Sequence, residues 1–284
     1  MSHVAVSRAR PVPIPAAPKY FRRIDLFHRL VHGFLMASFL GLAATGLPIR
    51  FNTEPWAAKL AQAVGGLGSV ISLHETSAVI LTLCLLLHLG KLGHTAFVKG
   101  EWGVFWGADS LVPQPKDGLD MLQHFQWFFG MGPRPRFDRF TYWEKFDYWV
   151  VLSGLAIVGT SGYLMWASSF FGSFLPGWVF NMALLIHSEE ALLLVCFIFA
   201  IHFFNAHLRP EKFPMDLVIF TGRISEDDLR DEHPLEMERL VAAGGLDDLQ
   251  ADPPPLWLRN FGRIIGLTAI TIGFTLFVLT LLAL

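Results

Sequence analysis

The chain alternates between long apolar runs and polar segments that are rich in charge, proline and glycine. Each apolar run approaches the length of about 20 residues that a helix needs to cross a bilayer. The pattern predicts five membrane-spanning helices, at Val31–Leu47, Val70–Gly90, Tyr148–Trp166, Asn181–Phe204 and Phe261–Leu284. The expected fold class is therefore an all-α integral membrane helical bundle.

The composition agrees with this interpretation. Hydrophobic residues make up 53% of the 284 residues, charged residues only 16%, and the mean hydropathy is +0.45. A water-soluble domain would have to expose much of this apolar surface to solvent. No apolar segment followed by a small-residue cleavage site precedes the first span, so we expect that span itself to direct insertion.

Basic residues are distributed unevenly among the polar segments. Six or seven Lys and Arg residues lie before the first span, after the second and again after the fourth, whereas residues 167–180 contain none and the first outer loop only Arg50 and Lys59. Basic loops stay preferentially in the cytoplasm. We therefore expect a multi-pass protein of the bacterial inner membrane with a cytoplasmic N-terminus and, after five crossings, an external C-terminus.

The same pattern divides the chain into four expected regions. Within the loop after the second span, Gly118–Phe129 has apolar residues at helical spacing, which predicts an amphipathic helix at the membrane interface. The regions are a cytoplasmic tail at 1–24, a four-helix core at 25–208 with a cytoplasmic loop at 91–146, a polar cytoplasmic segment at 209–258, and a fifth transmembrane helix at 259–284.

The fourth span carries a histidine near each end. His187 and His202 are about 22 Å apart along an α-helix and lie within about 60° of the same face. A metal-binding side chain inside a membrane is costly enough to be a functional candidate. One nitrogen ligand per leaflet indicates two stacked haems. Neither Cys84 nor Cys196 belongs to a Cys-x-x-Cys-His motif, so the haems would not be attached covalently.

Two pairings supply the second ligands. His74 and His88 in the second span are about 21 Å apart and within about 40° of one face. The second span could therefore mirror the fourth, with His74 opposite His187 and His88 opposite His202. Alternatively, His32 of the first span takes the place of His88 at the inner haem, and the spacing leaves both pairings open.

Several short motifs follow one another in an order typical of a known family. They are Arg29-x-x-His32, Thr45-Gly46, His74, Ser161-Gly162-x-x-x-Trp166, Leu185-Ile186-His187, Gly222-Arg-Ile-Ser and His233-Pro234. Over about residues 20–240 the chain resembles the gamma subunit of membrane-bound formate dehydrogenase. The wider group includes the cytochrome b subunits of nickel-iron hydrogenases and related bacterial di-haem cytochromes.

The resemblance implies two b-type haems and electron exchange with a quinone pool. It favours His32, His74, His187 and His202 as ligands, because the inner haem of that family takes its second ligand from the first helix. His88 is additional to the family pattern and stays the alternative ligand. Thr141-Tyr-Trp-Glu144 replaces the amide residues that help to form the quinone site in the formate dehydrogenase subunit.

The expected function is electron transfer across the bilayer between a quinone pool and a partner protein. Two axial imidazoles leave no position on the iron for a substrate, which suits electron transfer. We expect a quinone-reactive subunit of a respiratory oxidoreductase complex rather than a stand-alone enzyme. The partner would be a multihaem c-type cytochrome or an iron-sulfur or molybdoenzyme subunit. The first is suggested by the segment 206–216, which resembles the cytochrome b subunits found with multihaem c-type cytochromes. We expect no nucleic-acid partner. The alternative is a transporter or a haem-free scaffolding subunit.

A quinone site requires hydrogen-bond donors for two carbonyl oxygens and a route for protons. Polar side chains gather at the cytoplasmic boundary of the predicted spans, and they define the expected site: His28, Arg29, Lys145, Asn205 and His207. In an uninterrupted α-helix His207 would lie about 140° round from His202, so it would not face the same haem.

Overall fold

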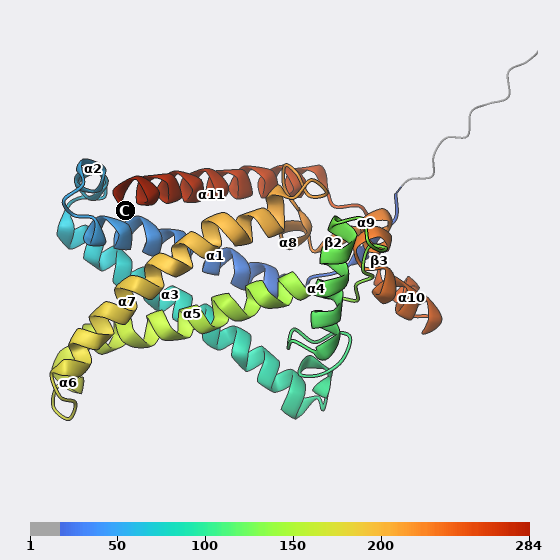
Figure 1. Ribbon diagram of the computed structural model, residues 1–284, viewed down its shortest axis with the longest axis horizontal. Helices are drawn as coiled ribbons and strands as arrows, with labels where there is room; N and C mark the ends of the chain where they lie inside the picture. Colours follow the sequence, from blue (N-terminus) through green and yellow to red (C-terminus); the bar gives the residue numbers. More distant parts are fainter. Residues whose placement is uncertain (1–17) are drawn as a thin grey trace, which may run out of the picture.

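Five long helices run along the longest axis of the molecule (Figure 1). The structure is a computed structural model and describes residues 18–284, so that residues 1–17 of the expected N-terminal tail lie outside the described part. The fold class predicted from the sequence is confirmed, and each helix begins several residues before the predicted apolar run. The five spans are Leu26–Arg50 (α1), Leu67–Val98, Tyr142–Trp166 (α5), Trp178–Leu208 and Leu256–Ala283 (α11). The second span consists of α3 (Leu67–Gly93) and the π-helical η1 (His94–Val98). The fourth consists of α7 (Trp178–Cys196) and two π-helical segments, η3 (Phe197–His202) and η4 (Phe204–Leu208).

Side-chain caps explain where two of these helices begin. The carboxylate of Asp25 accepts a hydrogen bond from the backbone N–H of His28 at 2.8 Å at the start of α1. Thr141 and Glu144 form a reciprocal capping box at the start of α5, with bonds of 3.3 and 2.8 Å. Thr141-Tyr-Trp-Glu144 is therefore a helix start in which the two polar side chains bind each other and the backbone.

The helices pack as two antiparallel pairs, α1 with α3 and α5 with α7, and α11 lies against α1 and η3. A Cβ atom added at Gly273 of α11 would lie 2.7 Å from the rings of Phe199 and Phe203, so a glycine permits this close approach. The shared core draws on all five spans and includes Phe39, Leu47, Leu81, Leu155, Leu194, Phe199 and Leu276.

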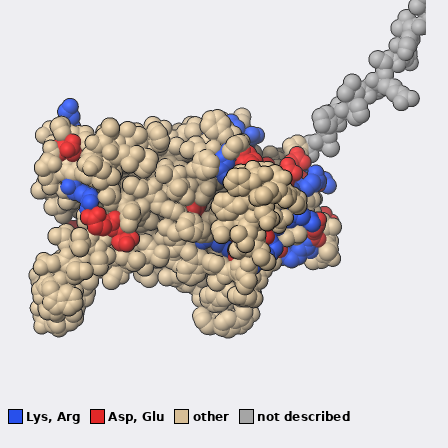
Figure 2. All heavy atoms as spheres, in the orientation of Figure 1, with Lys and Arg blue, Asp and Glu red and all other residues tan. Residues whose placement is uncertain are grey.

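Charged residues gather at the two ends of the molecule. Figure 2 shows most of them at one end, whereas the middle of the visible face is almost free of them. Many large apolar side chains of the long helices are exposed, among them Leu83, Leu86 and Leu193. Such side chains suit contact with lipid, and helices that satisfy their own backbone polar groups can cross a bilayer. The chain is a multi-pass membrane protein.

Short elements cover each end of the bundle (Figure 1). One end, called the outer end below after the orientation expected from the sequence, holds α2 (Pro55–Ala63), α6 (Ser168–Phe171) and the C-terminus of α11. A helix predicted over Gly118–Phe129 is present as α4. The opposite end, called the cap below, contains η2 (Trp102–Val104), α4 (Pro115–Phe128), α8 (Val218–Thr221), α9 (Glu226–Glu232), α10 (Pro234–Ala242), η5 (Asp247–Leu249) and three short strands.

The strands join the N-terminal segment to the segment that follows the fourth span. β1 (Tyr20–Arg22) lies between β2 (Arg223–Ser225) and β3 (Gln250–Ala251), antiparallel to both. The sequence pattern predicted only polar segments here. Strands of two or three residues are too short to show the period-two alternation that identifies a strand.

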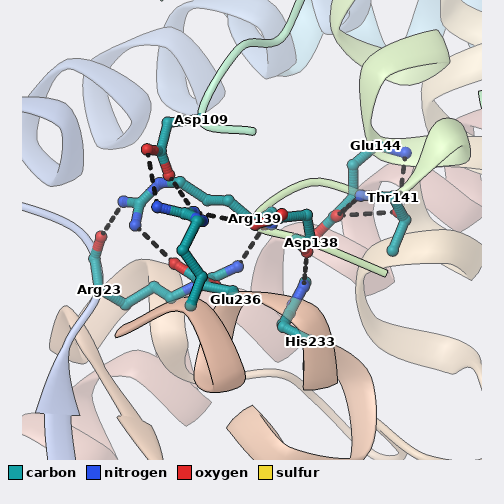
Figure 3. Close-up of polar contacts among 9 residues, drawn as sticks. Arg23, Asp109, Asp138, Arg139, Thr141, Glu144, His233 and Glu236 are labelled. Carbon is teal, nitrogen blue, oxygen red and sulfur yellow. Dashed lines mark hydrogen bonds and ion pairs between the residues drawn. The ribbon is translucent and has the colours of Figure 1, made fainter. Parts of the chain in front are cut away.

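A buried carboxylate ties three parts of the cap together. Glu236 of α10 is only 2% exposed and forms ion pairs with Arg23, which follows β1, and with Arg139, which precedes α5, the latter at 2.9 Å (Figure 3). Nearby, His233 donates from Nδ1 to the carbonyl oxygen of Asp138 at 2.8 Å. Burial, together with the charge of Arg23, lowers the pKa of His233, so its imidazole is neutral at pH 7.

Replacing Glu236 with alanine should loosen the cap. Two guanidinium groups would lose their buried partner, and breaking a buried ion pair typically costs about 3–5 kcal/mol. We expect faster tryptic cleavage between residues 209 and 258 in the detergent-solubilised chain. The control is Glu238→Ala, since Glu238 lies on the same helix but pairs with Arg136 on the surface, where both side chains are more than half exposed. Equal cleavage rates in the two variants would contradict a stabilising role for Glu236.

Candidate functional site

Two histidines from different spans face each other near the outer end. The rings of His74 on α3 and His187 on α7 have centroids 6.3 Å apart and planes inclined at 68°. This separation is of the order expected when two imidazoles bind one metal ion from opposite sides, each through a bond of about 2 Å. His74 and His187 are called the outer histidine pair below.

Hydrogen bonds fix the orientation of both rings. Nδ1 of His74 lies 2.9 Å from Oγ1 of Thr45, which itself donates to the carbonyl oxygen of Gly41 and therefore accepts from the imidazole. Nδ1 of His187 donates to the carbonyl oxygen of Val158 at 2.9 Å. Since Nδ1 carries the proton in each ring, Nε2 is left with a lone pair for a metal.

The two rings rest on equivalent cradles, each built from a backbone carbonyl, a hydroxyl three residues later and a glycine directly after it. A Cβ atom added at Gly46 would lie 3.2 Å from Cε1 of His74, and one at Gly162 would lie 3.0 Å from Cε1 of His187. Each ring therefore occupies space that only glycine leaves open. The equivalent sets are Leu42, Thr45, Gly46 and His74 in the first half, and Val158, Ser161, Gly162 and His187 in the second.

Three further histidines come together toward the cap end, and they are called the inner histidine cluster. His202 of η3 and His207 of η4 lie within electrostatic reach of His32 on α1. The Nδ1 atoms of His202 and His207 are buried and have no hydrogen-bond partner among the described residues. A buried nitrogen without a partner is costly, so the cluster suits a bound group that supplies ligation or hydrogen bonds.

The helix that carries His202 and His207 is not α-helical at this point. From Phe197 to Leu208 it is mostly π-helical, with hydrogen bonds between residues five apart. Residues five apart then share a face, so the angle of about 140° expected between His202 and His207 is wrong. π-Helical turns within α-helices are frequent at functional sites.

A carboxylate from α5 accompanies the inner cluster. Oδ2 of Asp147 lies 3.6 Å from Nδ1 of His202, and the side-chain amide of Asn205 donates to both carboxylate oxygens at 3.2 and 3.3 Å. Asp147 is 8% exposed. Sequence reasoning missed it because it directly precedes a predicted span and resembled a boundary residue. An acid beside a buried histidine would have been the signal to search for.

The contacts of His88 are made with residues outside the inner cluster. Its Nε2 is 2.9 Å from the hydroxyl of Tyr148, and its ring centroid is 6.0 Å from that of His28. The structure therefore brings His32, rather than His88, toward His202.

The five residues expected to bind a quinone are not brought together. Arg29 donates to the carbonyl oxygen of Phe220, Lys145 binds both carboxylate oxygens of Asp117 at 2.9 Å, and His28 lies 2.7 Å from Asp25. Asn205 and His207 do accompany the inner cluster.

Comparison with known proteins adds an independent observation. Residues 23–212 match the prokaryotic cytochrome b561 family, over a region that runs from α1 beyond η4. The chain belongs to the prokaryotic cytochrome b561 family. A comparison with curated proteins finds no match.

Membership of the cytochrome b561 family confirms the resemblance to membrane cytochrome b subunits. Proteins of this family bind b-type haem in the membrane and transfer electrons, and the histidines described above are the side chains here that suit such a cofactor. The matched region contains the first four spans, three of which carry histidines, whereas α11 lies outside it. Family membership favours electron transfer over the transporter or haem-free scaffold considered above.

Replacing Gly162 with alanine should disturb the outer histidine pair. The new methyl group would press on His187 and tilt its ring away from His74, so the haem content or the b-type absorbance should change. The matched control is Gly159→Ala on the same helix, because a Cβ atom there meets nothing within 4 Å. A reduced-minus-oxidised spectrum measures both variants, and identical spectra would argue against the glycine cradle.

Proposed function

We propose that this cytochrome b561-family protein is the membrane subunit of a respiratory redox complex. It would carry electrons across the bilayer between a quinone pool and a partner redox protein. The observation that carries the proposal is the placement of the histidines in two groups, one toward each end of the helix bundle. Two redox centres stacked across the membrane can connect its two faces.

The outer histidine pair is proposed to hold one b-type haem. Bound haem supplies one-electron redox chemistry through its iron. His74 and His187 would fill both axial positions, and the hydroxyl of Thr45 and the carbonyl of Val158 would keep the rings in the ligating orientation.

The inner haem is proposed to be held by His32 and His202. Asp147 is the carboxylate that would orient His202 and raise its basicity. His88 is the less favoured ligand, since Nε2 is already engaged by Tyr148.

The quinone is proposed to bind beside the inner cluster. Of the residues expected from the sequence, Asn205 and His207 are the two that lie there, and Nδ1 of His207 is buried without a partner. An imidazole N–H and a carboxamide are suitable donors for quinone oxygens. Arg29, Lys145 and His28 would act indirectly, by holding the surrounding helices in place.

The cap is proposed to face the cytoplasm, with the N-terminus on that side and the C-terminus outside. The basic residues of the cap support this orientation, because cytoplasmic segments retain them.

Topology reporters fused at Gly118, Gly172 and the C-terminus should report inside, outside and outside. An inside signal from the C-terminal fusion would mean that α11 does not cross the membrane.

The partner protein would dock at the outer end, near His187. It would be a multihaem c-type cytochrome or an iron-sulfur or molybdoenzyme subunit.

Alanine substitution of single histidines tests the ligand assignment. His74→Ala and His187→Ala should each abolish one b-type spectral component, and His32→Ala and His202→Ala should each abolish the other. His94→Ala is the control, since His94 is exposed on η1. Retention of both components in His32→Ala, with loss of one in His88→Ala, would show that the inner pair is wrong. Absence of any b-type band in the unmodified chain would favour a transporter or scaffold.

A further inference from the structure

A series of titratable side chains links the first three spans of the bundle and has no part in the proposed haem ligation. Nδ1 of His28 on α1 lies 2.7 Å from the carboxylate of Asp25. The ring of His28 is 6.0 Å from that of His88 on α3, and Nε2 of His88 is 2.9 Å from the hydroxyl of Tyr148 on α5. Asp25, His28, His88 and Tyr148 are called the proton path below.

Exposure falls along the proton path from the cap toward the interior. The side chains of Asp25 and His28 are 51% and 37% exposed, whereas His88 and Tyr148 are only partly exposed on spanning helices. The path therefore begins in contact with cytoplasmic water, in the orientation proposed above. It continues into a region that bulk water does not reach freely.

The proton path adjoins the inner histidine cluster along two helices. His28 is one helical turn before His32 on α1, so the two side chains lie on neighbouring parts of one face. On α5, Tyr148 directly follows Asp147, which binds Asn205. On these two helices the path therefore lies next to His32, a proposed ligand of the inner haem, and to Asp147, which accompanies His202 and Asn205.

The chemistry of the four side chains suits stepwise proton transfer. The Tyr148 hydroxyl can donate to Nε2 of His88 while it accepts a proton from a ligand. A neutral imidazole gains a proton at one nitrogen and releases one from the other. The gap between the rings of His28 and His88 is one that a single bridging water or a ring rotation can close.

The groups around His88 permit this role. His28 faces it from α1 and Tyr148 from α5, while Lys91, on the same helix as His88, lies 3.6 Å from Asp25. Among the described residues, His88 forms no ion pair. An interhelical hydrogen bond alone would explain the contact between His88 and Tyr148, but it would not require a second imidazole beside them.

We propose that Asp25, His28, His88 and Tyr148 conduct protons between cytoplasmic water and a quinol bound beside the inner histidine cluster. The inference rests on the proposed quinone function. Oxidation of a quinol to a quinone breaks two O–H bonds and releases two electrons and two protons. The electrons pass to the redox centres of the proposed function, and each proton leaves through Tyr148, His88 and His28 to Asp25 and water. Reduction of a quinone would use the same path in the opposite direction.

Anaerobic stopped-flow mixing of the full-length chain with decylubiquinol tests the proton path, with reduction followed by the b-type absorbance. His88→Asn and Tyr148→Phe should slow this reduction at least about 10-fold and raise its solvent isotope effect in D2O, while the haem content stays unchanged. His94→Asn is the matched control, because His94 is an exposed histidine in the same span. It should behave like the unmodified chain.

Chemical rescue separates proton transfer from a structural role. Added imidazole should restore much of the rate in His88→Ala, because a free imidazole can carry protons but cannot tie α3 to α5. Unchanged rates in His88→Asn and Tyr148→Phe would overturn the proposal, as would slow rates that imidazole does not restore, or loss of haem from His88→Asn. Failure of the unmodified chain to react with decylubiquinol, despite its b-type spectrum, would refute the quinone function itself and the path with it.

Discussion

An imidazole buried among apolar helices requires a partner for each of its nitrogens, and the structure depends on how those partners are supplied. At the outer pair, Thr45 and Val158 accept from Nδ1 of His74 and His187, which leaves Nε2 of each ring with a lone pair. These contacts also join α1 to α3 and α5 to α7. The same bonds that orient the candidate ligands therefore hold the two helix pairs in register.

At the inner cluster, by contrast, Nδ1 of His202 and Nδ1 of His207 are buried without a hydrogen-bond partner among the described residues. The helix that carries them has π-helical turns, and Asp147 provides a carboxylate beside His202. Buried nitrogens without partners, beside an acid, can form hydrogen bonds to a bound group. At the outer pair, Nδ1 of both rings is already hydrogen-bonded within the chain. This difference suits the proposed roles, in which the outer centre only passes electrons and the inner centre exchanges electrons with a quinone.

Much of this arrangement could be predicted from the sequence, because membrane spans and helical spacing are local properties. The five spans, the amphipathic helix α4 and the opposition of His74 and His187 follow from hydropathy and periodicity. The π-helical turns do not, since a change in hydrogen-bond register leaves no trace in an apolar pattern. Nor do the partners that engage Arg29 and Lys145, because Phe220 and Asp117 are distant in sequence and meet these side chains only in the folded chain.

The number of haems bound by one chain tests the account most directly. Pyridine haemochrome quantification of the purified protein, referred to its concentration by amino-acid analysis, measures haem type and stoichiometry together. Two non-covalent b-type haems per chain are predicted, one for the outer histidine pair and one for the inner cluster. A value of one, or none, would contradict the proposal that two stacked centres connect the two faces of the membrane.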